Sequence, residues 1–334
     1  MLLQRKALYN LLQLNLNRIE SGEFKVGKLH HWQIANYREK TSEELFHQLH
    51  GLGIVLESKD FEVFCKSFES PEEMVEILAK EREPLEKDQI FLILFELWRR
   101  YFPEKRTISI FCDELDYQMT AYDLRTPNEI GDALASLQLL LEEQVDRGLE
   151  PHLAFQLIQT YCANDIESFL FDYILNDVEE ANQQLARDLF DGFQPFVKGK
   201  IWFDYLAARI DILDDPEAGY GKLEKVVEQI HDGVNLDLVE EILFFLAHSG
   251  NHSLFYTLAK KALPLVHTEE EFQDFLEACY AHYDYLELKQ PAFAISLLFH
   301  SRTHISPETM LSQEDPGVKE VRSILEQKLH FAKE

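Results

Sequence analysis

The stretch that decides the fold is NLDLVEEILFFLAHSGNHSLFYTLAKKALPL, residues 235–265. It opens on Asn235, which can cap a helix, and apolar side chains then recur at the three-to-four-residue spacing of an amphipathic helix. Ser249-Gly250-Asn251 interrupts the pattern, because Gly250 suits the left-handed residue that ends a helix and Asn251 suits the start of the next. A second amphipathic segment follows. The stretch therefore predicts a helical hairpin with a short turn.

The C-terminal two thirds of the chain repeat this hairpin. Caps, prolines and glycine-containing breaks predict helix starts near residues 127, 150, 165, 178, 199, 216, 235, 251, 268 and 290. Taken in pairs, the first helices begin near 127, 165, 199, 235 and 268, so their spacings are 38, 34, 36 and 33 residues. A period in this range is typical of solenoids in which each hairpin buries its apolar face only against its neighbours.

We therefore predict an all-α protein with two parts. Residues 1–124 form a helical N-terminal domain, whose most hydrophobic helix is expected over residues 87–102. Residues 125–334 form an α-α superhelix of about five helix pairs, stacked as a right-handed solenoid. A final helix, from Asp315 to about Ala332, caps the stack. The boundary is placed before Thr126-Pro127-Asn128-Glu129, a cap–proline–acid signature of a helix start.

The charge is strongly negative and uneven. The 334 residues include 32 Lys+Arg and 60 Asp+Glu, for a net charge of −28. Residues 1–126 hold 17 basic and 22 acidic residues, a net of −5, and the remainder holds 15 and 38, a net of −23. Such a field repels phosphate backbones and anionic lipid. We therefore expect neither nucleic-acid nor membrane binding and favour basic or amphipathic protein segments as partners; solubility alone is the simpler explanation and stays open.

The sequence predicts a reducing, cytoplasmic compartment. Cys65, Cys112, Cys162 and Cys279 are far apart in the sequence without a C-x-x-C pair, so we expect small core side chains rather than disulfides or a zinc site. The apolar N-terminus lacks the uninterrupted hydrophobic region and cleavage site of a signal peptide. No run approaches the roughly 20 apolar residues of a membrane span.

Motifs for catalysis, metals or nucleotides are missing from the sequence. Three pairs of histidines lie three or four residues apart: His47 and His50, His248 and His252, and His300 and His304. None of these pairs carries the glutamate of H-E-x-x-H. Gly219-Tyr220-Gly221 is expected between helices, with no strand before it to position a phosphate. We expect no cofactor and no metal, and an enzyme whose active site is assembled from scattered acidic and histidine residues stays open as an alternative.

Two short clusters have unusual charge patterns. Asp113 and Asp116 share one face of a predicted helix, and we favour a solvated face over paired carboxylates for acid–base chemistry. Trp98, Arg99 and Arg100 begin a basic stretch interleaved with aromatics. Such a stretch can stack bases, but in so acidic a chain we favour docking against the acidic C-terminal part or an acidic partner.

One hairpin resembles the tetratricopeptide repeat. Gly250-Asn251-His252 followed by Lys260-Lys261-Ala262-Leu263 is similar to the second half of that repeat, with its Gly-Asn/Asp-aromatic turn and terminal Lys-Ala-Leu. Phe255 departs from the pattern, standing where the family has a small alanine, and no unit carries the Trp, Leu-Gly and Tyr set of the first helix. The resemblance extends at most over residues 127–303. It implies a peptide-binding superhelix.

In that register, certain side chains face the inner surface of the solenoid. They are Asp237, Glu240, Phe244 and His248, with Tyr280 and Tyr283 from the next unit. Acids and exposed aromatics suit a basic, partly apolar peptide, because charge steers the encounter and aromatic contact supplies affinity. The resulting hypothesis is a non-enzymatic scaffold or chaperone-like adaptor that holds a protein segment in an acidic groove. Two alternatives stay open. The aromatic side chains are merely core between helices, or the protein is purely structural and self-assembling.

Overall fold

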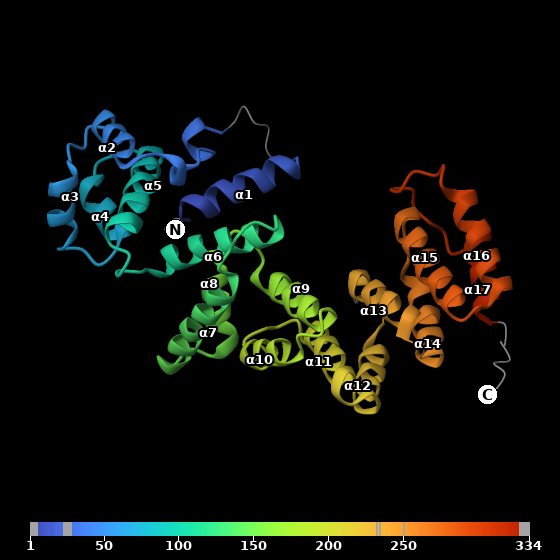
Figure 1. The fold of residues 1–334 in the computed structure, drawn as a ribbon. Coiled ribbons are helices and arrows are strands. Elements are labelled where there is room, and N and C mark those ends of the chain that lie inside the picture. The colour runs from blue at the N-terminus through green and yellow to red at the C-terminus, as the bar shows by residue number, and fades with distance from the viewer. Residues whose placement is uncertain (1–5, 23–28, 232, 234, 250, 327–334) are drawn as a thin grey trace. The chain divides into compact units, whose positions relative to one another are not determined.

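The computed structural model describes residues 6–22, 29–231, 233, 235–249 and 251–326. These residues form helices joined by turns, and their one β-type contact is an isolated bridge between Thr268 and Met310. The predicted all-α class is therefore confirmed. The chain divides into two compact units, residues 1–199 and 200–334 (Figure 1). The domain boundary predicted before residue 125 lies within the first unit and stays a prediction.

The first unit holds ten α-helices among its described residues. They are α1 (Leu8–Glu20), α2 (Ser42–Gly51), α3 (Ser58–Cys65), α4 (Pro71–Leu78), α5 (Pro84–Tyr101), α6 (Ile108–Asp123), α7 (Ile130–Asp146), α8 (Pro151–Gln159), α9 (Ile166–Glu179) and α10 (Gln183–Phe193). The 3₁₀ helices η2 (His31–Gln33) and η3 (Tyr37–Glu39) lie between α1 and α2. Thr41 shows how these starts are specified: its hydroxyl accepts from the backbone N–H of Glu44, and the Glu44 carboxylate accepts in return from the N–H of Thr41.

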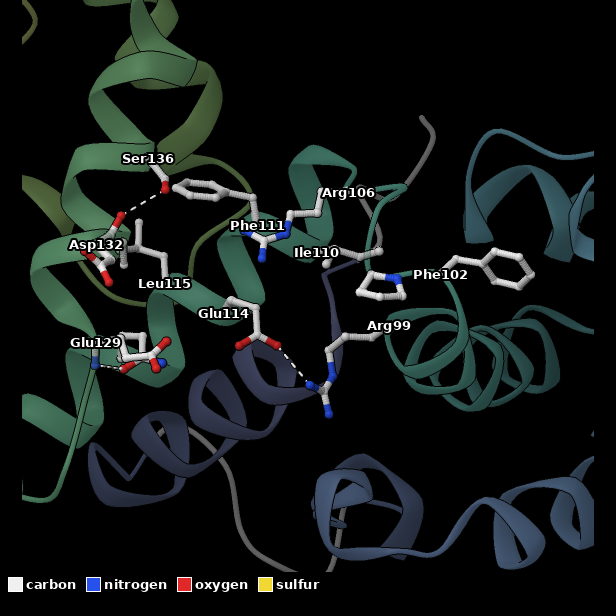
Figure 2. Close-up of a pocket in the computed structure, with 13 residues that line it drawn as sticks. Arg99, Phe102, Arg106, Ile110, Phe111, Glu114, Leu115, Glu129, Asp132 and Ser136 are labelled. Carbon is white, nitrogen blue, oxygen red and sulfur yellow. Dashed lines mark hydrogen bonds and ion pairs between the residues drawn. The ribbon is translucent and has the colours of Figure 1, made fainter. Parts of the chain in front are cut away.

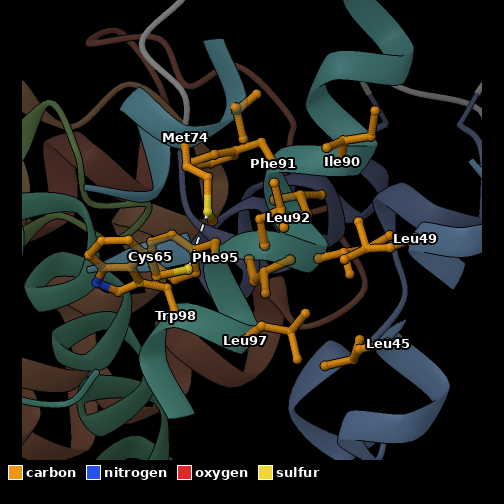
Figure 3. Close-up of a cluster of buried hydrophobic side chains, with 14 of the residues drawn as sticks. Leu45, Leu49, Cys65, Met74, Ile90, Phe91, Leu92, Phe95, Leu97 and Trp98 are labelled. Carbon is orange, nitrogen blue, oxygen red and sulfur yellow. Dashed lines mark hydrogen bonds between the residues drawn. The ribbon is translucent and has the colours of Figure 1, made fainter. Parts of the chain in front are cut away.

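Helix α5 is the centre of a hydrophobic core in this unit (Figure 3). All nine residues from Ile90 to Trp98 are buried, and α2 and α4 pack against the helix. Leu45 and Met74 contribute fully buried side chains from α2 and α4. Each fully buried side chain of this size contributes about 1.5–3 kcal/mol. The helix predicted over residues 87–102 is therefore present as α5, which begins three residues earlier, at Pro84.

The second unit holds seven α-helices among its described residues. They are α11 (Lys200–Asp214), α12 (Pro216–Gln229), α13 (Leu236–Ser249), α14 (His252–Ala262), α15 (Glu269–Tyr285), α16 (Lys289–Arg302) and α17 (Pro316–Glu326), with the 3₁₀ helix η4 (Leu263–Leu265) after α14. The ten predicted helix starts correspond to α7 through α16, and the largest error is at α10, predicted near 178 and observed at Gln183. The turn assigned to Gly250 and the end of the last predicted helix, beyond Glu326, lie outside the described residues.

Successive helix pairs in the second unit pack as neighbours. Each hairpin brings its two helices together, α13 also packs against α15, and α12 also packs against α14. Helix α17 contacts α14 and α16. First helices beside first helices and second helices beside second helices are the contacts of a helical repeat. The right-handed solenoid over residues 125–334 spans both units and stays a prediction.

Polar contacts and one glycine set the spacing of these pairs. Lys261 Nζ donates to the backbone oxygens of Val227, at 2.8 Å, and of Ile230, at 3.3 Å, so α14 caps the C-terminal end of α12. Gly219 lies within α12, which corrects the turn predicted there. A Cβ at Gly219 would come within 2.5 Å of the backbone nitrogen of Ile212, so the glycine allows α11 and α12 to approach closely.

The helices of the described residues are too short or too polar to cross a lipid bilayer.

Candidate functional site

Carboxylates gather where α13 packs against α15. We name this surface the acidic face, and it consists of Asp237, Glu240, Glu270, Asp274 and Glu277. Asp237, Glu270 and Glu277 are exposed, whereas Glu240 and Asp274 are half-buried. The acidic face therefore concentrates negative charge that is partly withdrawn from water.

The electrostatics of the acidic face are unbalanced. Burial and, after it, the neighbouring charges of Asp274 and Asp237 together raise the pKa of Glu240 to about 7. Each charge that acts on the pKa of Glu240 belongs to a carboxylate. Within the described residues, its buried Oε1 has no hydrogen-bond partner. The pKa of Asp274 is also raised, by burial and then by Glu270 and Glu277. A cation placed on this face would relieve the repulsion.

The residues predicted to line the groove differ in how far their side chains are exposed. Asp237 and His248 are exposed and Phe244 is half-buried along α13. Tyr280 is 41% exposed on α15, three residues beyond Glu277 and so beside the acidic face.

Tyr283 corrects the prediction, because its side chain is fully buried. Its ring centroid lies 6.3 Å from that of Tyr256 and 5.9 Å from that of His282. Tyr283 is therefore core between helices and offers no surface to a partner.

The side chains of the predicted basic cluster mostly form hydrogen bonds and ion pairs within the first unit. Trp98 is fully buried, and its Nε1 donates to the backbone oxygen of Lys105 at 3.1 Å. Arg99 and Arg100 both donate to the buried carboxylate of Glu96, at 2.7 Å. Glu96 is a site residue that was not predicted from the sequence, although the two arginines three and four residues later are a local signal for it. The side chain of Trp98 is thus closed to a partner, and the arginines neutralise an internal charge.

The predicted solvated face on α6 is wrong, because Asp113 and Asp116 are fully buried. Asp113 accepts from the backbone N–H of Tyr9 at 2.5 Å and from Arg38 Nη2 at 2.8 Å, so it caps α1. Asp116 accepts from the backbone N–H of Ala163 at 2.8 Å, and burial raises its pKa to about 7. The two carboxylates hold distant segments against α6. The hydrogen bonds that they accept compensate their burial, so their role is structural.

A pocket of 430 Å³ lies where the end of α5 meets α6 and α7 (Figure 2). Arg99 Nη1 donates to Glu114 Oε1 at 3.2 Å in this pocket, and the side chain of Arg106 also lines it (Figure 2). Glu129 and Asp132 line the far side, so three carboxylates face two guanidinium groups. This balance of charge favours neither an anion nor a cation strongly.

Histidines in the second unit form a core contact rather than a ligand set. His282 is fully buried and stacks on Phe255 at 3.7 Å between centroids, with His252 edge-on at 5.4 Å. Burial lowers the pKa of His282 to about 4. The described residues contain no group of three or more His, Cys, Asp or Glu side chains that could hold a metal ion.

The chain matches no protein-family model, and no curated protein or solved structure is significantly similar to it.

Proposed function

We propose that the protein is a binding scaffold whose acidic face, on α13 and α15, holds a basic segment of another protein. The observation that carries the proposal is Glu240, a half-buried carboxylate whose pKa is raised to about 7 and whose neighbouring charges are all acidic. Lysine or arginine side chains would neutralise this repulsion, and they would gain more there than on an ordinary surface because the site is partly desolvated.

Aromatic side chains beside the acidic face favour a segment that is also partly apolar. Tyr280 and Tyr285 are 41% and 53% exposed, and the ring of His248 lies 6.2 Å from that of Tyr285. Tyrosines contribute contact area at low cost in side-chain entropy and are enriched in binding surfaces. The occupant that fits best is therefore an amphipathic basic helix or strand.

The proposal extends to the type of repeat. We assign the hairpins of residues 200–302 to a tetratricopeptide-like arrangement. Lys261, in the Lys-Lys-Ala-Leu stretch, joins α14 to the preceding hairpin through the backbone of α12, and α13 packs against both α14 and α15. These contacts are the neighbour-to-neighbour contacts on which such repeats depend.

The test is fluorescence anisotropy of a labelled amphipathic Lys-rich peptide titrated with the full chain. The double variant Asp237→Asn/Glu240→Gln should weaken binding by about tenfold, because it removes two carboxylates that a basic side chain would pair with on the acidic face. Affinity should also fall as salt rises. The matched control is Glu224→Gln/Glu228→Gln, which removes two exposed charges from α12 of the same unit and should leave affinity nearly unchanged. Equal loss in both double variants would show that net charge alone, and not the acidic face, holds the peptide.

A neutral peptide of the same length and apolar pattern completes the design. It should bind at least about tenfold more weakly than the Lys-rich peptide. If the two peptides bind equally, the role of the acidic face is wrong. Light scattering of the free chain then tests the self-assembling alternative directly.

A further inference from the structure

A second pocket, of 880 Å³, lies in the first unit where the end of α6 meets α9. Its wall includes three aromatic rings: Tyr122 from α6, and Phe169 and Tyr173 from α9. The centroid of Tyr122 lies 5.7 Å from that of Phe169 and 5.0 Å from that of Tyr173, in edge-on contacts. Phe169 and Tyr173 stack at 5.9 Å. Rings from two helices thus meet in one cluster inside a pocket of the size that small ligands occupy.

The rim of the same pocket is acidic. Asp123, Asp165, Asp172 and Glu180 line it, against the single cation of Arg125. In the described part of the chain, neither Asp123 nor Asp172 has an ion-pair partner. The surrounding segment, residues 127–199, holds 14 Asp+Glu and 3 Lys+Arg, a net of −11. Burial and then the charge of Asp123 raise the pKa of Asp172, so the carboxylates repel one another.

A buried carboxylate also acts on the rings. Asp177 on α9 is 6% exposed, and its charge raises the pKa of both Tyr122 and Tyr173 after the effect of burial. Asp177 Oδ1 accepts from Asn182 Nδ2 at 3.2 Å, whereas Oδ2 has no hydrogen-bond partner among the described residues. A negative charge close to the rings adds to the attraction that their electron-rich faces exert on a cation.

We propose that this pocket binds an organic ammonium cation, either the side chain of a lysine in a partner segment or a free alkylamine of similar size. The rings accept the apolar stem and attract the charged head through cation–π contact, while the carboxylates of the rim neutralise the head. A metal ion fits less well, because aromatic rings are not ligands for hard cations and the described residues hold no metal-binding group of three carboxylates, histidines or cysteines. Phosphates and other anions are repelled.

This site is independent of the acidic face, since it lies in the other unit. The failure of one proposal therefore leaves the other standing. The direct test is isothermal titration calorimetry of the full chain with Nα-acetyl-lysine-N-methylamide, with its Nε-acetyl counterpart and with n-butylammonium. Acetylation removes the charge and keeps the stem, so the acetylated compound should bind at least about fivefold more weakly. If only the lysine compound binds, the source is a protein segment; if n-butylammonium binds as well, a free amine suffices.

Variants locate the binding. Tyr173→Leu and Asp172→Asn should each weaken binding of the lysine compound by about fivefold, because each removes one source of attraction. Asp172 is exposed, so its variant keeps the fold, and circular dichroism checks both. Asp188→Asn, an exposed charge on α10, and Phe293→Leu, an exposed ring on α16, are the matched controls and should leave affinity unchanged. Equal binding of the acetylated compound, no binding up to about 10 mM, or unchanged affinity in both pocket variants would overturn the proposal.

Discussion

Replacing Arg302 by methionine should strongly destabilise the second unit. Arg302 joins the end of α16 to the starts of α15 and α17: its Nε donates to Glu269 Oε1 at 2.8 Å, and its Nη1 donates to Asp315 Oδ1 at 2.8 Å. Nη2 donates to Glu269 Oε2 at 2.5 Å, which completes a bidentate pair. Glu269 is 1% exposed and Arg302 is 9% exposed. Methionine fills much of the space of the arginine stem, so the change chiefly removes the charge.

The expected loss of stability depends on how deeply each carboxylate that loses its arginine partner is buried. Removing one partner of a buried ion pair costs about 3–5 kcal/mol, because the remaining charge stays desolvated without compensation. The side chain of Asp315 is 24% exposed, so water partly compensates its charge. The loss of its ion pair with Arg302 therefore adds about 1 kcal/mol or less to the cost. We therefore expect Arg302→Met to lower the free energy of unfolding by about 4 kcal/mol, a large part of the 5–15 kcal/mol typical of a domain. Arg302→Lys keeps the charge without the planar fork and should cost about half as much.

The assay is hydrogen exchange in increasing urea, read on amides of α15, α16 and α17, which reports on this unit separately from the first. Adding Glu269→Gln to Arg302→Met should recover at least about 1 kcal/mol, because the unpaired charge is then gone. The control is Lys319→Met, which breaks an exposed pair with Glu314 and should leave the free energy of unfolding nearly unchanged. If Arg302→Met costs no more than the control, the pair is screened by solvent and the reasoning fails.

Four further predictions concern other sites. Asp113→Ala should cost about 2 kcal/mol or more, measured by urea unfolding, because it removes the cap of α1 and the buried one of the two carboxylates that pair with Arg38; a loss under about 1 kcal/mol would contradict it. Leu243→Asp should loosen neighbouring hairpins together, because Leu243 is fully buried; exchange confined to α13 would show independent hairpins. The four cysteines are buried, and burial raises the pKa of Cys65 to about 12, so a thiol reagent should label them only on unfolding, and rapid labelling of the native chain would refute this. Neutral His282 contributes stability above about pH 6.5 that is lost as pH falls towards its folded pKa of about 4, so wild type should lose up to about 3 kcal/mol more over that range than His282→Gln; parallel pH profiles would exclude this role.

The helix starts were predictable because their signals are local. A capping side chain bonds to backbone N–H groups two or three residues away, so Asn251 and Thr268 mark the starts of α14 and α15 within their own sequence neighbourhood. The start of α7 shows the limit of this reasoning. Its cap–proline–acid signature predicted a start at 127, but Gln118 of α6 accepts from the backbone N–H of Glu129, and the helix begins at Ile130. A side chain from another helix thus holds the backbone just before the observed start, and no local pattern identifies that contact.

Part of the candidate site was predictable for the same reason. Helical spacing places Asp237, Phe244 and His248 along one face of α13, and that spacing is a property of the chain alone. The repulsion on Glu240 was not predictable, because its largest neighbouring charge, Asp274, is 34 residues away in the sequence and is brought close only by the packing of α13 against α15.

The sequence by itself determined an all-α chain of helical hairpins, because periodicity and capping act within a few residues. Only the tertiary structure decided which charged and aromatic side chains are buried. Asp113 is buried because Tyr9 and Arg38, which are 104 and 75 residues away in the sequence, supply its hydrogen bonds, whereas the exposed Asp237 has the same chemistry in a similar helix. Burial of a charge depends on partners that compensate its desolvation, and such partners come from segments that no local pattern identifies.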